Sequence, residues 1–199
     1  MQIDIFINRI DCCITKMKIV TLLIFFLLFA NALSAQTDSI KWSKYTLIEW
    51  NDFKAPVDKK IPFYSTTKAT IQYKYHCTSY NLKEGVWHFR FEVESYFLKN
   101  ESWCIPGKQS DALLEHERLH NDINEIFARK LFMEFNKQTY TWNYETEIKE
   151  IFNRVHKAAQ QMQAQYDEET NHFLNKAKQA EWQLYIQSQL DTLPQHRYQ

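Results

Sequence analysis

The chain is poor in glycine: only Gly85 and Gly107 occur among its 199 residues. A Rossmann GxGxxG fingerprint or a Walker phosphate loop needs several glycines close together, so the nucleotide-binding folds built on those loops are excluded. The chain also lacks an excess of charge of either sign, because 24 Lys and Arg residues balance 24 Asp and Glu residues. Nucleic-acid binders need a basic excess to release phosphate counterions, so we expect no nucleic-acid partner.

Long hydrophobic runs are absent except near the start, at residues 19–30 (IVTLLIFFLLFA). Lys16 and Lys18 precede this run and small residues follow it as far as Ala35, the pattern of a secretory signal peptide. The run is also shorter than the roughly 18 residues that span a membrane. We predict a signal peptide over 1–35, with Met17 as an alternative start. Residues 36–199 would form a single periplasmic or secreted domain without a stable membrane anchor.

Cysteine is scarce in the part that remains after cleavage, where only Cys77 and Cys104 are left. Two cysteines without a CxxC pair are not typical of a zinc-thiolate site. An oxidising compartment permits one disulfide between them, and the distance between their Cα atoms decides whether it forms.

Two segments alternate between apolar and polar residues, at 66–77 (TTKATIQYKYHC) and 86–97 (VWHFRFEVESYF). Alternation with period two, rich in aromatic and β-branched residues, indicates strands. Residues 81–85 offer a hairpin connection between them. The sequence therefore predicts a small antiparallel sheet with one buried face.

The apolar residues change to helical spacing after Ser110, a candidate N-cap. A second helix is predicted from about Glu145 to Tyr166, a polar break at 167–171, and a third helix through about Leu190. Strands followed by helices indicate an α+β fold, with a small antiparallel sheet followed by a helical half.

The first predicted helix contains the HExxH motif His116-Glu117-Arg118-Leu119-His120. Residues four apart lie on one helix face, so the two imidazoles can converge on one ion. The glutamate beside the first histidine is placed to take a proton from a water held by that ion. We therefore predict a catalytic zinc site with His116 and His120 as ligands and Glu117 as general base.

A catalytic zinc needs a third protein ligand. If the first two helices pack antiparallel, the end of the second returns to the start of the first, where the histidines lie. This favours the segment 166–172, in which His172 is the preferred ligand. The carboxylates of the same segment are the alternatives: Asp167, Glu168 and Glu169.

Three blocks, at 49–54 (EWNDFK), 113–123 (LLEHERLHNDI) and 166–172 (YDEETNH), resemble a bacterial secreted domain-of-unknown-function family regarded as a predicted zinc-dependent protease of the zincin type. The similarity continues through 174–182. The resemblance implies a zincin-like metallopeptidase in which His116, His120 and His172 bind the metal and Glu117 is catalytic. The family usually has glycine where this chain has Phe173.

We therefore expect a zinc metalloprotease that acts on a peptide or protein substrate. An extended peptide could pair with the edge of the predicted strand 86–97. Tyr166 is a candidate oxyanion donor, with a buried core tyrosine as the alternative. Two further functions stay open: a catalytically silent periplasmic binding module stabilised by zinc, and a zinc amidase acting on a cell-wall or other non-peptide substrate.

Overall fold

The computed structural model describes residues 38–194, so the signal peptide predicted over 1–35 lies outside the described residues. Within this range the element order is a set of strands followed by three helices, which is the α+β arrangement predicted from the sequence. No helix between Asp38 and Pro194 combines the length and the apolar character needed to cross a membrane.

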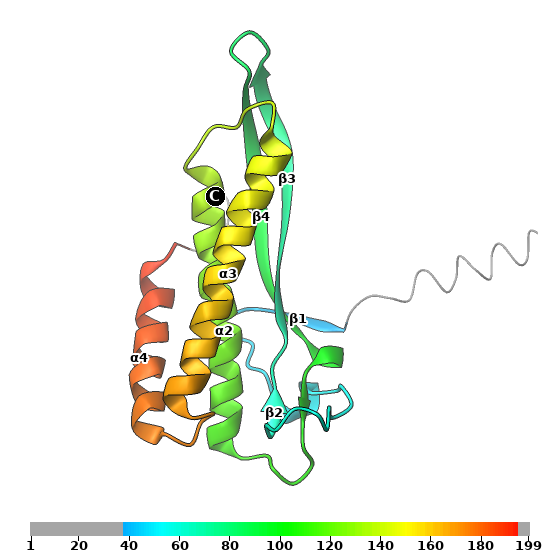
Figure 1. Cartoon of the computed structure of the whole chain (residues 1–199), viewed down its shortest axis with the longest axis vertical. Coiled ribbons are helices and arrows are strands. Elements are labelled where there is room, and N and C mark those ends of the chain that lie inside the picture. Colours follow the sequence, from blue (N-terminus) through cyan, green and yellow to red (C-terminus); the bar gives the residue numbers. More distant parts are fainter. Residues whose placement is uncertain (1–37, 195–199) are drawn as a thin grey trace, which may run out of the picture. The chain divides into compact units, whose positions relative to one another are not determined.

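Two long antiparallel strands, β3 (Ala69–Asn81) and β4 (Val86–Leu98), form a hairpin that confirms the predicted alternation. Gly85 closes the turn with φ 66°, a left-handed conformation that glycine adopts without a steric penalty. A short strand, β1 (Ser39–Lys41), pairs with the far end of β4, so β4 is the middle strand of the sheet. The tip of the hairpin extends past the ends of the helices that cover the sheet (Figure 1).

Three helices follow: α2 (Asp111–Asn136), α3 (Tyr144–Thr170) and α4 (Lys176–Thr192). Ser110 caps α2 as predicted, because its side-chain oxygen accepts a hydrogen bond from the amide of Leu113. The predicted break at 167–171 is wrong, since α3 continues to Thr170 and ends at Asn171, whose φ of 46° is left-handed. Asp167 is thereby fixed on a helix instead of lying in a loop.

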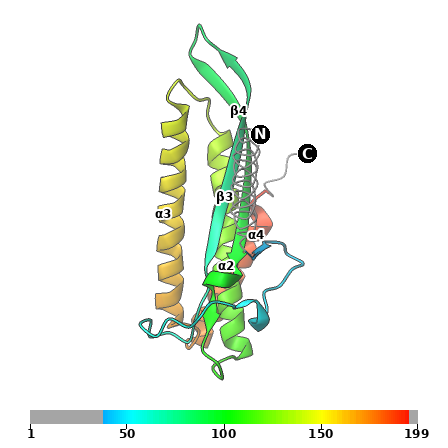
Figure 2. The same ribbon diagram turned by 90° about the vertical axis from the view of Figure 1, so that its right-hand side faces the viewer.

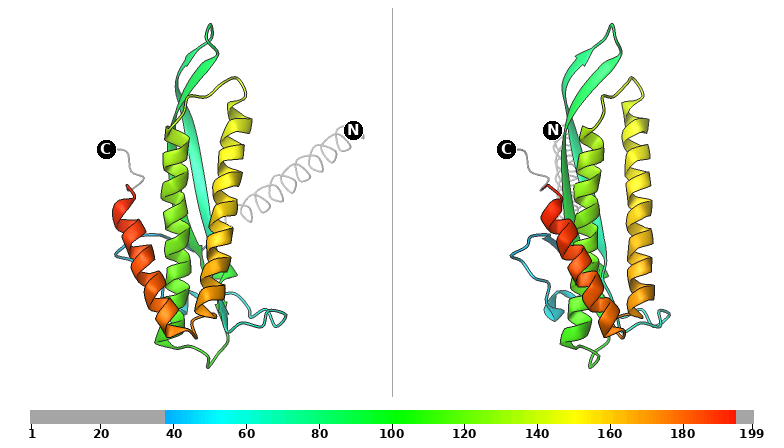
Figure 3. Two further views of the ribbon diagram at one scale, coloured as in Figure 1. Left: turned by 60° about the vertical axis from the view of Figure 1, so that its left-hand side comes forward. Right: turned by 90° about the vertical axis from the view of Figure 1, so that its left-hand side faces the viewer.

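The central helix, α2, lies between α3 and α4, and the views of Figure 3 show the three side by side. Seen along the sheet, β3 and β4 pack against α2 (Figure 2). Phe91 and Val93 of β4 and Ile123 of α2 are almost fully buried between these layers. Because α2 and α3 run in opposite directions, the C-terminal end of α3 lies beside the N-terminal part of α2 (Figure 1).

Short elements lie close to the start of α2. The strands β2 (Ser65–Thr66) and β5 (Trp103–Cys104) pair with each other, and the 3-10 helices are η1 (Trp50–Asp52) and η2 (Lys99–Glu101). Arg118 of α2 ties the segment before η1 to the helix, because it donates to the carbonyl of Ile48 and to the Glu49 carboxylate. Cys77 and Cys104 are free thiols, so the disulfide that the sequence permits is not formed.

A buried arginine of α2 joins this helix to the C-terminal end of α4. Arg129 pairs with Glu125 one turn earlier on α2, at 2.8 Å, and both side chains are almost fully buried. The same guanidinium donates to the carbonyls of Leu190 and Leu193, at 2.6 and 3.1 Å. These bonds satisfy carbonyl groups at the C-terminal end of α4, which no longer have partners within the helix.

Candidate metal centre

The two histidines of the HExxH motif face each other on α2. Their Nε2 atoms are 3.1 Å apart, and their rings stand edge to face. His116 is buried and His120 is partly exposed. The helix spacing therefore brings the two imidazoles together as the sequence predicts.

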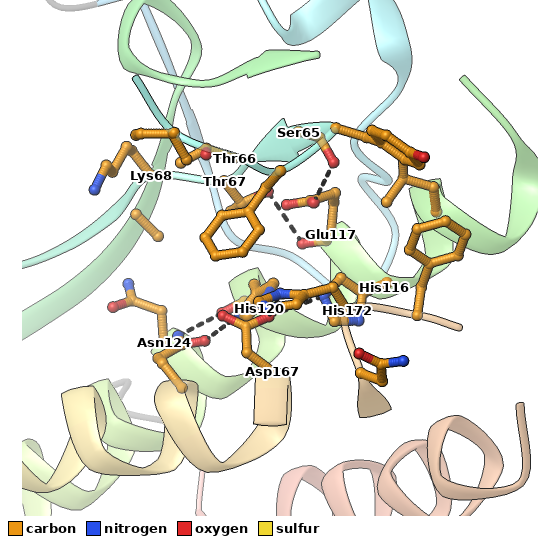
Figure 4. Close-up of a pocket in the computed structure, with 18 of the residues that line it drawn as sticks. Ser65, Thr66, Thr67, Lys68, His116, Glu117, His120, Asn124, Asp167 and His172 are labelled. Atoms are coloured by element: carbon orange, nitrogen blue, oxygen red, sulfur yellow. Dashed lines mark hydrogen bonds and ion pairs between the residues drawn. The ribbon is translucent and has the colours of Figure 1, made fainter. Parts of the chain in front are cut away.

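Asp167 completes a group of three from the last turn of α3. Its Oδ1 lies 3.1 Å from Nε2 of His116 and 3.0 Å from Nε2 of His120 (Figure 4). Among residues 38–194, His116, His120 and Asp167 form the group whose ligand atoms lie close enough together to hold a metal ion. Two imidazoles and a carboxylate are a donor set suited to zinc.

Two glutamines bind the outer nitrogens of the imidazoles. Oε1 of Gln179 lies 3.2 Å from Nδ1 of His116, and Oε1 of Gln163 is hydrogen-bonded to Nδ1 of His120. An amide oxygen can only accept, so each Nδ1 carries a proton and each Nε2 is left to face Asp167. Two Nε2 atoms and a carboxylate oxygen then lie together, an arrangement that a shared proton or a cation would stabilise. The residues present therefore fit a metal ion.

The pKa values follow from these contacts. Burial acts to raise the pKa of Asp167, but the hydrogen bonds and the charge of the two histidines outweigh it, so the pKa lies well below its usual range. Burial acts to lower the pKa of His120, but the hydrogen bond and charge of Asp167, together with Glu117, hold that pKa above its ordinary value. Asp167 is thus an anion beside two imidazoles, which favours a bound cation.

Glu117 lies next to this group in the buried part of α2. Its Oε1 accepts a hydrogen bond of 2.5 Å from the Ser65 hydroxyl of β2 (Figure 4). Its Oε2 is buried and has no hydrogen-bond partner among residues 38–194. A buried carboxylate oxygen without a partner is costly, and here it belongs to the residue predicted to accept a proton.

His172 lies beside the group but is not one of its three members. Its Nδ1 is 3.2 Å from Oδ1 of Asp167, and its ring packs on Phe63 with centroids 4.1 Å apart. The structure thus brings Asp167, an alternative in the predicted segment, up to both HExxH histidines and places His172 on Asp167. His172 as a metal ligand stays a prediction.

Tyr166 has the buried-core position, and the geometry does not support its candidate role as an oxyanion donor. It is 0% exposed, and its ring stacks on His116 with centroids 4.6 Å apart. Its hydroxyl donates to the carbonyl of His116 and is hydrogen-bonded to Gln179. Tyr166 therefore holds His116 in position and does not face the cavity as a donor.

A cavity of about 610 Å³ opens over the metal group. The segment 61–69, which includes β2, lines one side, and α2, α3 and the turn after α3 line the rest. No residue of β4 lines this cavity. The lining of the cavity therefore does not support the predicted pairing of a peptide with the edge of strand 86–97, which stays a prediction.

Sequence reasoning missed the side chains that position the metal group and Glu117. Gln163 precedes Asp167 by one helical turn, a spacing that could have indicated a shared face. Ser65 and Gln179 carry no such local signal, because the contact between Ser65 and Glu117 joins residues 52 positions apart.

The comparisons with known proteins bear on this region. Residues 101–173 match a family of bacterial proteins of unknown function, DUF922. The match confirms the resemblance to a bacterial domain-of-unknown-function family. It contains the HExxH motif and the block 166–172, and does not extend to the blocks at 49–54 and 174–182. No curated protein and no solved structure matched. The DUF922 description assigns no activity, so the function rests on the site itself.

Proposed function

We propose that the protein is a zinc-dependent hydrolase, most simply a peptidase, whose metal is held by His116, His120 and Asp167. The observation that carries the proposal is the convergence of these donor atoms beside a buried glutamate oxygen without a partner. The cavity over the group is large enough for part of a peptide chain. Export to the periplasm or beyond follows from the signal peptide predicted over 1–35.

The metal would act as a Lewis acid, which polarises a carbonyl group and lowers the pKa of a water molecule toward about 7. Three protein ligands leave a position open for that chemistry. Zinc is the ion that this imidazole and carboxylate set suits best, in agreement with the zincin resemblance of the HExxH motif.

Glu117 would act as the general base through Oε2. The Ser65 hydroxyl holds Oε1 and so fixes the plane of the carboxylate. The partnerless Oε2 is then the atom that accepts a proton from water and returns it to the leaving amine. Gln163 and Gln179 hold the imidazoles so that each Nε2 faces Asp167.

The ligand set is tested by zinc stoichiometry and affinity on the purified protein and four alanine variants: His116→Ala, His120→Ala, Asp167→Ala and His172→Ala. We expect one zinc per chain, lost in the first three variants. His172→Ala should keep zinc with affinity lowered by about 10-fold to 100-fold, as for a residue that orients a ligand. If His172→Ala lost zinc completely while Asp167→Ala retained it, the third ligand would be His172 and not Asp167. No zinc in the intact protein would contradict the proposal.

The reaction is tested with Glu117→Gln, which keeps the shape of the side chain and removes its basicity. We expect this variant to bind zinc as the wild-type protein does and to lose hydrolysis of unstructured protein substrates by at least about 100-fold. Full activity in Glu117→Gln would exclude the glutamate as base. Absence of hydrolysis in the zinc-loaded wild-type protein, with unfolding on chelation, would favour the binding module.

A further inference from the structure

We infer that the site selects a substrate with a bulky apolar side chain, which packs against an aromatic wall formed by Phe63, Tyr64 and Phe173. This inference rests on the proposed function and names the substrate class of the same site. The three residues line the cavity that contains the metal group. They come from two separate segments, the stretch before β2 and the turn after α3.

The aromatic wall lies directly beside the metal group. The ring of Phe63 packs on His172 at 4.1 Å, and the ring of Phe173 lies 6.4 Å from that of His116. The rings of Tyr64 and Phe173, which come from the two different segments, lie with their centroids 6.3 Å apart. Phe63 and Tyr64 are 38% and 43% exposed, so they retain surface that an apolar group can cover. Burying this apolar surface against a substrate side chain would favour binding.

The backbone at Phe173 adds an independent observation. Asn171, His172 and Phe173 have φ values of 46°, 49° and 74°, three left-handed residues in succession without a glycine. A residue with a Cβ is strained in this region, and such strain concentrates at functional sites. Glycine at position 173 would adopt the φ of 74° without strain, so the ring of Phe173 is kept at the cavity against a local conformational cost.

The other side of the cavity is polar, so the apolar side chain of a substrate would face the aromatic wall. Lys68 and Asn124 lie on the side of the metal group away from His116 (Figure 4). His156, Gln160 and Gln163 line the same cavity from α3. A large apolar side chain would have to desolvate these groups there, whereas at the aromatic wall it meets three aromatic rings, of which that of Tyr64 also contacts the Lys108 ammonium.

The test measures the affinity of small metal-chelating probes for the zinc-loaded protein by titration calorimetry. The probes are N-acetylated hydroxamates of leucine, phenylalanine, alanine and glutamate, which share the chelating group and differ in the side chain. Zinc content is measured on every sample. We expect the leucine and phenylalanine probes to bind at least about tenfold more tightly than the other two, as a few methylene groups allow in an apolar pocket.

Phe173→Gly removes the ring while glycine accepts the φ of 74°, so the turn is retained. We expect this variant to keep its zinc and to lose most of the preference for the leucine and phenylalanine probes over the alanine probe. Leu184→Ala serves as the control, because Leu184 is 75% exposed on α4 and does not line the cavity. It should behave as wild type.

The possible outcomes test the inference, the role of the aromatic wall and the proposed function separately. Equal affinity for the four probes in the zinc-loaded wild-type protein would overturn the inference and leave the metal site standing. An undiminished preference in Phe173→Gly would overturn the role of the aromatic wall. A wild-type protein without zinc would overturn the proposed function and this inference with it.

Discussion

At the scale of single residues, the site depends on side chains that touch neither metal nor substrate. Each HExxH imidazole has its Nδ1 held by a glutamine from another helix, Gln163 on α3 and Gln179 on α4. Gln179 also bonds the hydroxyl of Tyr166, whose ring stacks on His116. The orientation of His116 is therefore fixed on two sides, by a hydrogen bond and by an aromatic ring.

Gln179→Leu should weaken zinc binding by about 10-fold to 100-fold, because it leaves the Nδ1 proton of His116 without its acceptor and removes one of the hydrogen bonds of the Tyr166 hydroxyl. The measurement is a zinc competition titration against a chelator of known affinity. Gln183→Leu is the matched control, one turn further along α4, where the side chain makes only a long 3.4 Å contact with Glu115. An unchanged zinc affinity in Gln179→Leu would show that the ring of Tyr166 suffices.

At the scale of elements, the start of α2 determines where the HExxH motif lies. Ser110 accepts a hydrogen bond of 3.2 Å from the amide of Leu113, and this bond satisfies one of the free donors of the first turn. His116 follows within two turns. The cap thus contributes both to stability and to the position of the first metal-binding histidine.

Replacing this cap gives a direct test. Ser110→Ala should lower the free energy of unfolding by about 1 kcal/mol, measured by urea titration. Ser110→Asp retains a side-chain acceptor and adds a negative charge at a helix N-terminus, so it should be as stable as wild type or more so. Equal stability of the alanine and wild-type proteins would mean that Ser110 contributes nothing as a cap.

The long strands and helices could be predicted from the sequence because their patterns of apolar residues repeat many times. The alternation around Phe91 and the helical spacing around Ile123 each extend over many residues, and both predictions are confirmed. The end of α3 was predicted too early because residues 167–170 are mostly polar, although the helix continues through them. The two-residue strands β2 and β5 have no readable period, so Ser65 could not be connected with Glu117.

At the scale of the whole molecule, buried charge makes stability depend on pH. Burial raises the pKa of Glu125 to about 7, against the opposing effect of Arg129. In the unfolded chain the pKa is near the ordinary value of 4.5. Between these two values the folded state holds a proton that the unfolded state has lost. The free energy of unfolding therefore falls as pH rises from about 5 to 7, by an amount on the order of 3 kcal/mol.

Glu125→Gln mimics the protonated side chain, so this contribution to the pH dependence should vanish. We expect the variant to match the wild-type protein at pH 5 and to lose less stability than wild type on going to pH 8, measured by urea unfolding at each pH. Glu150→Gln, at an exposed position of α3, is the control and should follow wild type. A variant that is equally destabilised at both pH values would contradict the raised pKa.

The bonds from Arg129 to Leu190 and Leu193 make the carboxyl-terminal end of α4 more than a peripheral addition. A protease that trimmed the chain before Leu190 would remove both carbonyl acceptors and leave the buried guanidinium with Glu125 and the Trp42 ring beside it. The domain would lose far more stability than the burial of the removed apolar surface contributes, because the charge of Arg129 stays buried without its hydration. Nicking near the end of α4 would thus destabilise the entire domain.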